Sequence, residues 1–215
     1  MRVGTWNLAG RWDNRHERMM LDQGCDVWLL TEVRERVAIG GFFGRMTAGC
    51  MARGRRWAAI LSREPISALQ DPHPATAAAI VGDITFASSV LPWRSCPSRT
   101  PWVGFRHADK TRAALDQLLS SLPPKGLVWG GDFNQSLLGK DYSGSQEGCR
   151  YIRAALDLLA LQVPTEALPH RVAGVMSIDH IAVARGLPTS AARRVVASVG
   201  DRRLSDHDLY TVEIP

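Results

Sequence analysis

Short apolar runs rich in strand-forming residues recur along the whole chain. Each is four to seven residues long and is bounded by turn-forming residues, a pattern typical of buried strands. The runs that we expect to form strands are Val3–Leu8, Val27–Thr31, Trp57–Ser62, Ala78–Val81, Ile84–Val90, Leu127–Gly130, Ile178–Ala184, Arg194–Val199 and Leu209–Ile214. Several follow one another with only turns between them, so the pattern does not favour a regular alternation of strand and helix.

Three segments carry a helical pattern instead. In His107–Leu122 the apolar residues fall on one face of a helix, and two prolines follow. Helices are also expected over Glu147–Leu161 and over Asn14–Gln23, where Asp13 is a candidate N-cap. Because strands outnumber helices, we expect one domain over residues 1–215, in which two sheets pack together with the helices outside.

The composition is that of an ordinary globular protein. The 215 residues are 45% hydrophobic and 22% charged, which excludes disordered, collagenous and coiled-coil classes. The four cysteines form no C-x-x-C pair, so we expect reduced thiols and no zinc knuckle. No run reaches the roughly 20 apolar residues of a membrane span, and no signal-peptide pattern opens the sequence. We therefore expect a cytoplasmic monomer.

Positive charge is concentrated in one segment. The chain has 26 Lys and Arg against 21 Asp and Glu, and in Pro92–Arg112 five basic residues accompany a single acidic one. Trp93, Trp102 and Phe105 lie among these charges. Cations interleaved with aromatic rings bind phosphates and stack on bases in nucleic-acid-binding surfaces. The alternative is a solvated loop with partly buried tryptophans, and the sequence does not decide between the two.

Oxygen-bearing side chains gather at the ends of five expected strands. The segments are Thr5–Leu8, Leu30–Val33, Gly130–Asn134, Ser177–His180 and Leu204–Asp208. Asn7, Glu32 and Asp206 offer the hard oxygen ligands that Mg²⁺ or Mn²⁺ prefers, whereas the His and Cys spacing of a zinc site is absent. The sequence also lacks a nucleophilic serine elbow and a P-loop, so activated water is the expected nucleophile and a phosphoester the expected electrophile.

Six short motifs resemble, in the same order, those of the endonuclease/exonuclease/phosphatase superfamily, which includes abasic endonucleases, deoxyribonuclease I, sphingomyelinases and inositol polyphosphate phosphatases. They are Thr5-Trp6-Asn7-Leu8, Thr31-Glu32, Trp57–Arg63, Gly131-Asp132-Phe133-Asn134, Ile178-Asp179-His180-Ile181 and Ser205-Asp206-His207. The resemblance spans nearly the whole chain. It implies a four-layered α/β sandwich, with two mixed sheets face to face and helices outside, and a metal-dependent phosphoesterase site at one edge.

The resemblance also implies which residues bind the cation. Glu32 would be the principal ligand of Mg²⁺ or Mn²⁺, with Asn7 and Asp206 nearby.

Four further residues would carry the chemistry. The resemblance implies that Asp132 orients or deprotonates the attacking water and that Asn134 holds a phosphate oxygen. His207 would contact the scissile phosphate, oriented and charged by Asp179, because a neighbouring carboxylate favours the imidazolium form. In-line attack on phosphorus needs such a positioned water and a cation near the non-bridging oxygens.

One position departs from the family pattern. The family has a histidine in an N-T-H-L stretch before the long loop, and the matching stretch here, Ser88–Leu91, has Val90 at that place. A phosphate contact is therefore missing. His107, Trp93 and Arg94, all from the basic segment, are candidates to replace it.

These observations favour a Mg²⁺-dependent phosphodiesterase, specifically a nuclease acting on DNA or RNA, because the excess positive charge lies with aromatic residues beside the expected site. Arg202 and Arg203 are further candidates to steer an anionic substrate, with a solvated turn as the alternative. One other possibility is an enzyme acting on a small nucleotide, an inositol phosphate or a lipid head group. Another is a nucleic-acid- or protein-binding module with a weakened site; Val90 favours it, and the retained polar cluster opposes it.

Overall fold

The computed structural model describes residues 1–140 and 142–215 and contains two large β-sheets and three helices. The strands of the first sheet are β1 (Arg2–Asn7), β2 (Val27–Arg34), β3 (Phe43–Met46), β4 (Cys50–Ala52), β5 (Arg55–Ser62), β12 (Ala192–Val195) and β15 (Leu209–Glu213). Those of the second are β6 (Ser67–Ala68), β7 (Thr76–Val81), β8 (Ile84–Val90), β9 (Leu127–Asp132), β10 (Leu161–Gln162) and β11 (Asp179–Ala184). A separate hairpin joins β13 (Ser198–Val199) and β14 (Arg202–Arg203).

Both sheets are mixed. The first has the order β12-β15-β1-β2-β5-β3, with β4 also paired to β5, and the second has the order β10-β11-β9-β8-β7-β6. In the first sheet β1 and β2 run parallel, and in the second β8 and β9 do so. The other strand pairs of the two sheets are antiparallel.

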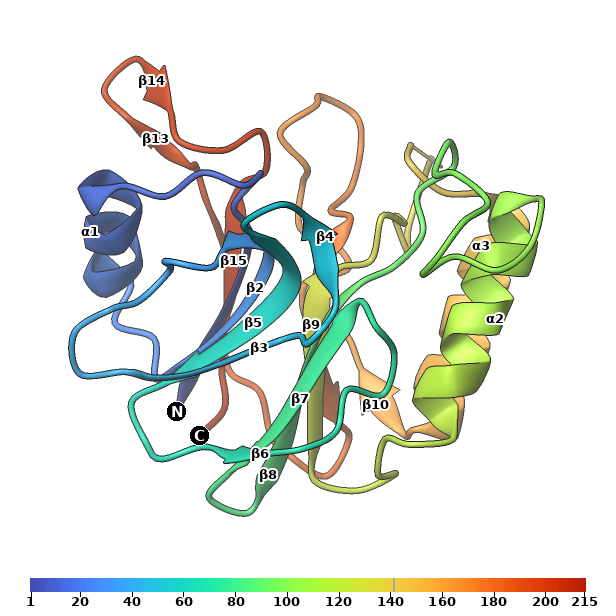
Figure 1. Ribbon diagram of the computed structural model, residues 1–215, viewed down its shortest axis with the longest axis horizontal. Helices are drawn as coiled ribbons and strands as arrows, with labels where there is room; N and C mark the ends of the chain where they lie inside the picture. Colours follow the sequence, from blue (N-terminus) through green and yellow to red (C-terminus); the bar gives the residue numbers. More distant parts are fainter. Residues whose placement is uncertain (141) are drawn as a thin grey trace.

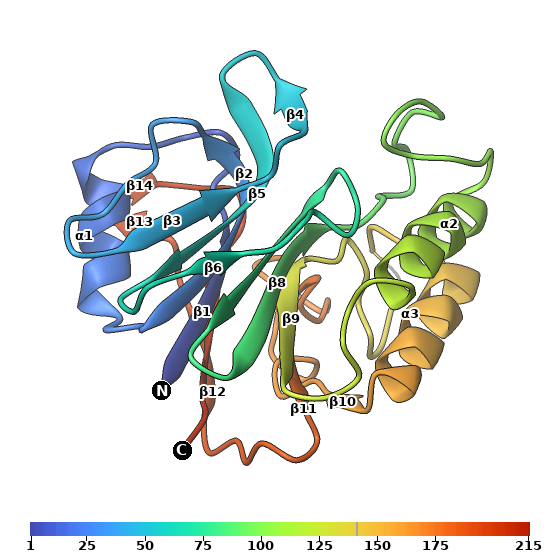
Figure 2. The same cartoon turned by 60° about the horizontal axis from the view of Figure 1, so that its bottom comes forward.

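The sheets lie face to face with helices on both outer sides (Figure 1). Apolar residues from the two inner faces form one buried cluster, which includes Val3 and Leu29 of the first sheet and Val128 and Ile181 of the second. The helices α2 (His107–Leu119) and α3 (Gln146–Leu158) pack side by side on the outer face of the second sheet, as Figure 2 also shows. The shorter α1 (Asn14–Asp22) covers the other sheet. The expected mixed α/β architecture is confirmed.

The expected elements differ from the observed ones mainly at their ends. Helix α1 begins after Asp13, whose side chain accepts hydrogen bonds from the first-turn amides, as predicted. The run Arg194–Val199 is divided between β12 and β13, and Leu161 belongs to β10 rather than to the preceding helix. The short strands β3, β4, β6 and β14 were not predicted, because they are two to four residues long and mostly exposed.

The four cysteines are free thiols. None of the helices in the described part of the chain is long and apolar enough to cross a membrane.

Candidate active site

The alternation of side chains along the strands brings three polar residues to one edge of the sandwich. Successive residues of a strand point to opposite faces. Asn7 is four residues beyond Val3, Asp132 is four beyond Val128, and Asp179 is two before Ile181, so each shares the inner face with a core residue. β9 and β11 pair with Asp132 directly opposite Asp179. The two carboxylates therefore meet where the apolar core ends.

Asn7 joins the two sheets through its side-chain amide. Its Nδ2 atom donates hydrogen bonds to Oδ2 of Asp132 at 2.9 Å and to Oε1 of Glu32 at 3.2 Å. Its Oδ1 atom accepts a hydrogen bond from the amide of Ala9 at 2.8 Å, which fixes the orientation of the amide group. Asn7 thus holds a carboxylate of each sheet in place.

The backbone at Glu32 leaves regular strand geometry. Glu32 has a φ of 51°, and the pairing of β2 with β5 passes from Thr31 to Val33 without it. A left-handed φ costs a residue other than glycine roughly 1–3 kcal/mol, and such conformations concentrate at functional sites. This irregularity sets the Glu32 side chain beside Asn7 and Arg55, whose Nη2 atom lies 3.7 Å from Oε2.

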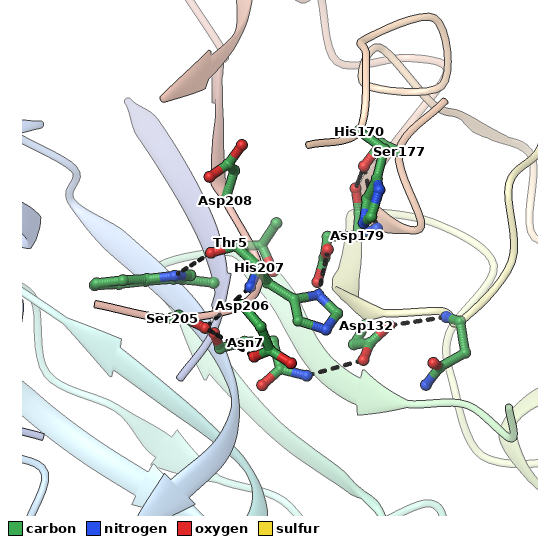
Figure 3. A network of polar contacts seen from close by, with 12 residues as sticks. Thr5, Asn7, Asp132, His170, Ser177, Asp179, Ser205, Asp206, His207 and Asp208 are labelled. Atoms are coloured by element: carbon green, nitrogen blue, oxygen red, sulfur yellow. Dashed lines mark hydrogen bonds and ion pairs between the residues drawn. The ribbon is translucent and has the colours of Figure 1, made fainter. Parts of the chain in front are cut away.

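His207 faces the carboxylate pair from the loop before β15. Its Nδ1 atom lies 2.8 Å from Oδ2 of Asp179, which is fully buried (Figure 3). The Oγ atom of Ser205 accepts a hydrogen bond from the amide of His207 and donates one to the carbonyl of Asn7. The indole of Trp6 donates to the carbonyl of His207. The imidazole is therefore held by its ring and by its backbone.

The protonation states follow from burial and from these close charges. Burial opposes a charge on His207, but Asp179 and Asp132 outweigh it and raise the pKa of His207 to about 10. Burial and the charge of Asp179 raise the pKa of Asp132 to about 7. Burial also raises the pKa of Glu32, with a contribution from Asp132. At neutral pH the site thus holds an imidazolium among carboxylates, and too little positive charge lies nearby to balance those carboxylates.

Asn134 follows Asp132 in a second left-handed conformation, with a φ of 51°. Its amide donates a hydrogen bond to Oδ1 of Asp132 at 2.9 Å, and its Nδ2 atom donates to the carbonyl of Leu91 at 3.0 Å. Its Oδ1 atom accepts from Oγ of Ser143 at 3.1 Å. The turn after β9 therefore orients Asp132 and anchors two loops that border the site.

Two groups of residues offer atoms to a divalent cation. Ligand atoms of Asp132, Asp179 and His207 all lie within 4.8 Å of one another. A cationic imidazole has no lone pair to give a metal, however, so the raised pKa of His207 disfavours this set.

The residues expected from the sequence fit a cation better. Glu32 and Asp206 offer carboxylates. Asn7 connects them, because its side chain donates a hydrogen bond to Glu32 and its backbone carbonyl accepts one from Ser205, the residue before Asp206. The raised pKa of Glu32 marks a carboxylate whose burial is poorly compensated, which a divalent cation would correct. Oxygen ligands of this kind suit Mg²⁺ or Mn²⁺.

Val90 occupies the inner face beside Asp132, its partner in the parallel pairing of β8 and β9. Its side chain is buried in an apolar cluster with Trp57 and Trp102. A histidine there would have to replace this packing, which explains why an apolar residue suits the position in this chain.

The three candidates for the missing phosphate contact lie in different surroundings. His107 sits at the start of α2, where its ring nitrogens lie 2.8 Å from Oγ of Ser145 and 3.0 Å from the carbonyl of Pro92. Nδ1 therefore already joins α2 to the N-cap of α3, and Nε2 already contacts the start of the basic segment. Trp93 is half-buried against Trp102.

Arg94 is exposed and borders the turn after β9. Its amide donates a hydrogen bond to the carbonyl of Ser143 at 2.8 Å, and its guanidinium donates to the carbonyl of Gly144. Because Ser143 also bonds Asn134, Arg94 is the candidate whose contacts lead most directly to the site.

The basic segment is less exposed than its composition indicates. Trp102 is buried in the cluster around Val90, and the buried Lys110 donates a hydrogen bond from Nζ to the carbonyl of Cys96. Arg106 is paired with Asp109. Phe105 is 92% exposed. The segment therefore combines a packed aromatic base with an exposed tip.

The two arginines before the Ser-Asp-His motif differ in their contacts. Arg202 is exposed in β14, whereas Arg203 pairs with the buried carboxylate of Asp208 at 2.7 Å. Arg194 pairs with the same carboxylate. Arg203 thus has a structural partner, which the sequence did not indicate.

Two aromatic side chains near His207 were missed by the sequence analysis. The ring of His170 lies 6.4 Å from that of His207, and the ring of Tyr142 lies 5.3 Å from that of His170. Neither belongs to one of the motifs quoted above. No sequence signal marks them, because only the folding of two distant loops brings them together.

Comparison with known proteins gives one family and a shared fold. The model of the Endonuclease/Exonuclease/phosphatase family matches residues 4–207. No curated protein matches the chain. An AP endonuclease from Archaeoglobus fulgidus has 15% identity and a TM-score of 0.76, with 100% of this chain and 99% of that chain covered.

Two further structures share the fold, with similar sequence identity and TM-scores. The 3′ phosphatase NExo from Neisseria, bound to a product DNA hairpin, has 16% identity and a TM-score of 0.76, with 100% of this chain and 99% of that one covered. The endonuclease domain of TRAS1, a telomere-specific non-LTR retrotransposon, has 16% identity and a TM-score of 0.71, with 99% and 97% covered.

Proposed function

Because this chain belongs to the Endonuclease/Exonuclease/phosphatase family, whose members hydrolyse phosphoesters, we propose that it is a divalent-metal-dependent phosphodiesterase acting on nucleic acid. The observation that carries the proposal is the array in which Asn7 links Glu32 to Asp132 while Asp179 holds His207. In our proposal this array supplies a metal ligand, a base and a cation at one edge of the sandwich.

Asp132 is the residue best placed to activate water. Its carboxylate is fixed by Asn7 on one oxygen and by the amide of Asn134 on the other. Its pKa of about 7 is close to neutral, which is where a general base combines sufficient ionisation with sufficient basicity. In the proposed reaction Asp132 accepts the proton of a water molecule that attacks phosphorus.

His207 supplies positive charge close to Asp132. With a pKa of about 10 it is an imidazolium throughout the physiological range. A fixed cation that faces the phosphoryl oxygens stabilises the charge that develops in the transition state. Asp179 keeps the ring oriented and protonated, so in our proposal it acts through His207.

Glu32, Asn7 and Asp206 would hold the cation, Mg²⁺ or Mn²⁺. The cation, when bound, neutralises phosphate charge and orients the scissile group. Without it, the clustered carboxylates of Glu32 and Asp132 would repel an anionic substrate.

Nucleic acid is the proposed substrate class for two reasons. The exposed cations Arg94 and Arg99 and the exposed ring of Phe105 lie in a segment that leaves the site at Leu91. Phosphates bind to such cations and bases stack on such rings. In addition, the structures of similar fold include an AP endonuclease and a phosphatase bound to product DNA.

The test is hydrolysis by the wild type and by Glu32→Ala, in Mg²⁺, Mn²⁺ or EDTA. The substrates are single- and double-stranded DNA, RNA, an abasic duplex, inositol phosphates and a generic phosphodiester. Glu64→Ala is the matched control, since Glu64 is an exposed glutamate just beyond the other end of β5. We expect nucleic-acid cleavage that needs metal, is lost in Glu32→Ala and is retained in Glu64→Ala.

Other outcomes would contradict the proposal in different ways. Turnover of inositol phosphates alone would replace the substrate class and retain the chemistry. Full activity in EDTA, or in Glu32→Ala, would refute the assigned metal site. Salt-sensitive binding of nucleic acid without turnover of any substrate would identify a binding module.

A further inference from the structure

Tyr142 and His170 come from two loops that meet over the site. Tyr142 lies in the segment between β9 and α3, and His170 lies between β10 and β11. Their ring centroids are 5.3 Å apart. Tyr142 is 47% exposed, whereas His170 is 6% exposed. One ring therefore faces solvent while the other supports it from inside.

These rings are tied to the residues of the proposed reaction. The His170 ring contacts the ring of His207 edge to face, with centroids 6.4 Å apart, and Figure 3 shows it beside the pair of Asp179 and His207. Ser143, the residue after Tyr142, donates its hydroxyl hydrogen to Asn134. One loop thus contacts His207, which we assign to the phosphate, and the other contacts Asn134, which orients Asp132.

His170 has an environment that keeps it neutral. Its Nδ1 atom accepts a hydrogen bond from the amide of Val172 at 3.1 Å, so its proton resides on Nε2. Burial, together with the charge of His207, lowers the pKa of His170 to about 4. A neutral ring between Tyr142 and an imidazolium adds aromatic surface without adding charge, which suits a planar group better than a second phosphate.

We propose that Tyr142, supported by His170, stacks on a nucleobase next to the scissile phosphate and so selects nucleotide substrates over phosphoesters that lack a base. This proposal rests on the function proposed above and deepens it. Stacking requires an exposed π-face that is held at a fixed place, and the contact with His170 provides this for Tyr142. His170 is a positioning residue in this arrangement.

Two chromogenic substrates that differ in the base test the proposal. Thymidine 5′-(p-nitrophenyl phosphate) and methyl p-nitrophenyl phosphate share a leaving group, but only the first carries a nucleobase. We expect Tyr142→Ala to raise KM for the thymidine substrate roughly 10-fold, because one stacked base is lost, while kcat and the methyl substrate change little. Tyr142→Phe should restore the wild-type KM.

The control is Phe43→Ala, which removes another half-exposed ring. Phe43 pairs with Ser62, at the end of the first sheet that lies away from Glu32. His170→Ala should reproduce the selective rise in KM, and its thermal unfolding is measured beside it. An equal effect of Tyr142→Ala on both substrates, or no effect on either, would overturn the proposal.

Binding without turnover separates this proposal from the function on which it rests. Fluorescence anisotropy in Ca²⁺, a divalent cation that takes oxygen ligands as Mg²⁺ does, compares an oligothymidylate with an abasic oligonucleotide of the same length. We expect the wild type to prefer the oligothymidylate and Tyr142→Ala to lose that preference, even if no substrate is hydrolysed. Hydrolysis without any base preference in wild-type binding would overturn the stacking role and leave the phosphodiesterase standing.

Discussion

Removing the charge of Asp179 should move the pH range over which the enzyme works. The change is Asp179→Asn, which keeps the shape of a side chain that is fully buried. In the wild type, Oδ2 of Asp179 lies 2.8 Å from Nδ1 of His207, and its charge is the largest of the effects that raise the pKa of His207 to about 10. Without it, burial opposes the protonation of His207 and the charge of Asp132 still favours it, so we take the ordinary pKa as the reference.

The size of the effect follows from the fraction of imidazolium. At pH 8 a group of pKa about 10 is roughly 99% protonated. If the substitution returns the pKa of His207 to its ordinary value of 6.5, only about 3% remains protonated at that pH. We therefore expect kcat/KM to fall about 30-fold at pH 8 and about 4-fold at pH 7.

The assay is the pH dependence of kcat/KM between pH 5 and 10.5 at saturating Mg²⁺. The descending limb of the wild type should lie near pH 10, and that of Asp179→Asn should move to near pH 6.5. Asp22→Asn, at the exposed end of α1, is the control and should keep the wild-type profile. A folded Asp179→Asn protein that retains a descending limb near pH 10 would refute the role of His207 as a cation charged by Asp179.

Three further predictions concern structural groups around the site. His180 is fully buried, and burial lowers its pKa to about 4. The unfolded chain therefore binds a proton more readily, so the stability that neutral His180 contributes is complete above pH 6.5 and is lost as the pH falls toward 4. We expect urea unfolding to show a loss of up to about 3 kcal/mol over this range, and a flatter profile in His180→Gln. His107→Ala should lower the free energy of unfolding by about 1–3 kcal/mol, because the contacts of His107 with Ser145 and Pro92 are lost, while kcat and KM stay unchanged. A selective rise in KM would instead identify His107 as a phosphate ligand. Asp208→Ala leaves two partly exposed arginines without their buried partner and should cost about 2 kcal/mol in thermal or urea unfolding; an unchanged stability would show that these pairs contribute nothing net.

The sequence predicted the strands that form the core because their apolar runs are long enough to show a pattern. It also predicted that Asn7, Asp132 and Asp179 lie at strand ends. It could not show that Asp132 faces Asp179 directly, because the pairing of β9 with β11 joins segments that are far apart in the chain. The perturbed pKa values of the site arise from that register.

The limits of the sequence are clearest in the basic segment. Its composition indicated a cationic surface with three aromatic rings, whereas the structure buries Trp102 and leaves Phe105 exposed. Burial of one ring and exposure of another three residues away depend on packing against Trp57 of the other sheet. The contact between Tyr142 and His170 depends in the same way on tertiary structure alone.

The most direct test of the account is the rate of phosphodiester hydrolysis by wild type and Asp132→Asn, each measured in Mg²⁺ and in EDTA. Removal of a general base costs about 10²- to 10⁴-fold in rate. We predict that the wild type turns over only with Mg²⁺ and that Asp132→Asn, folded to the same extent, loses activity by this factor. Hydrolysis by Asp132→Asn at the wild-type rate, or by the wild type in EDTA, would contradict the central claim that Asp132 activates water in a metal-dependent site.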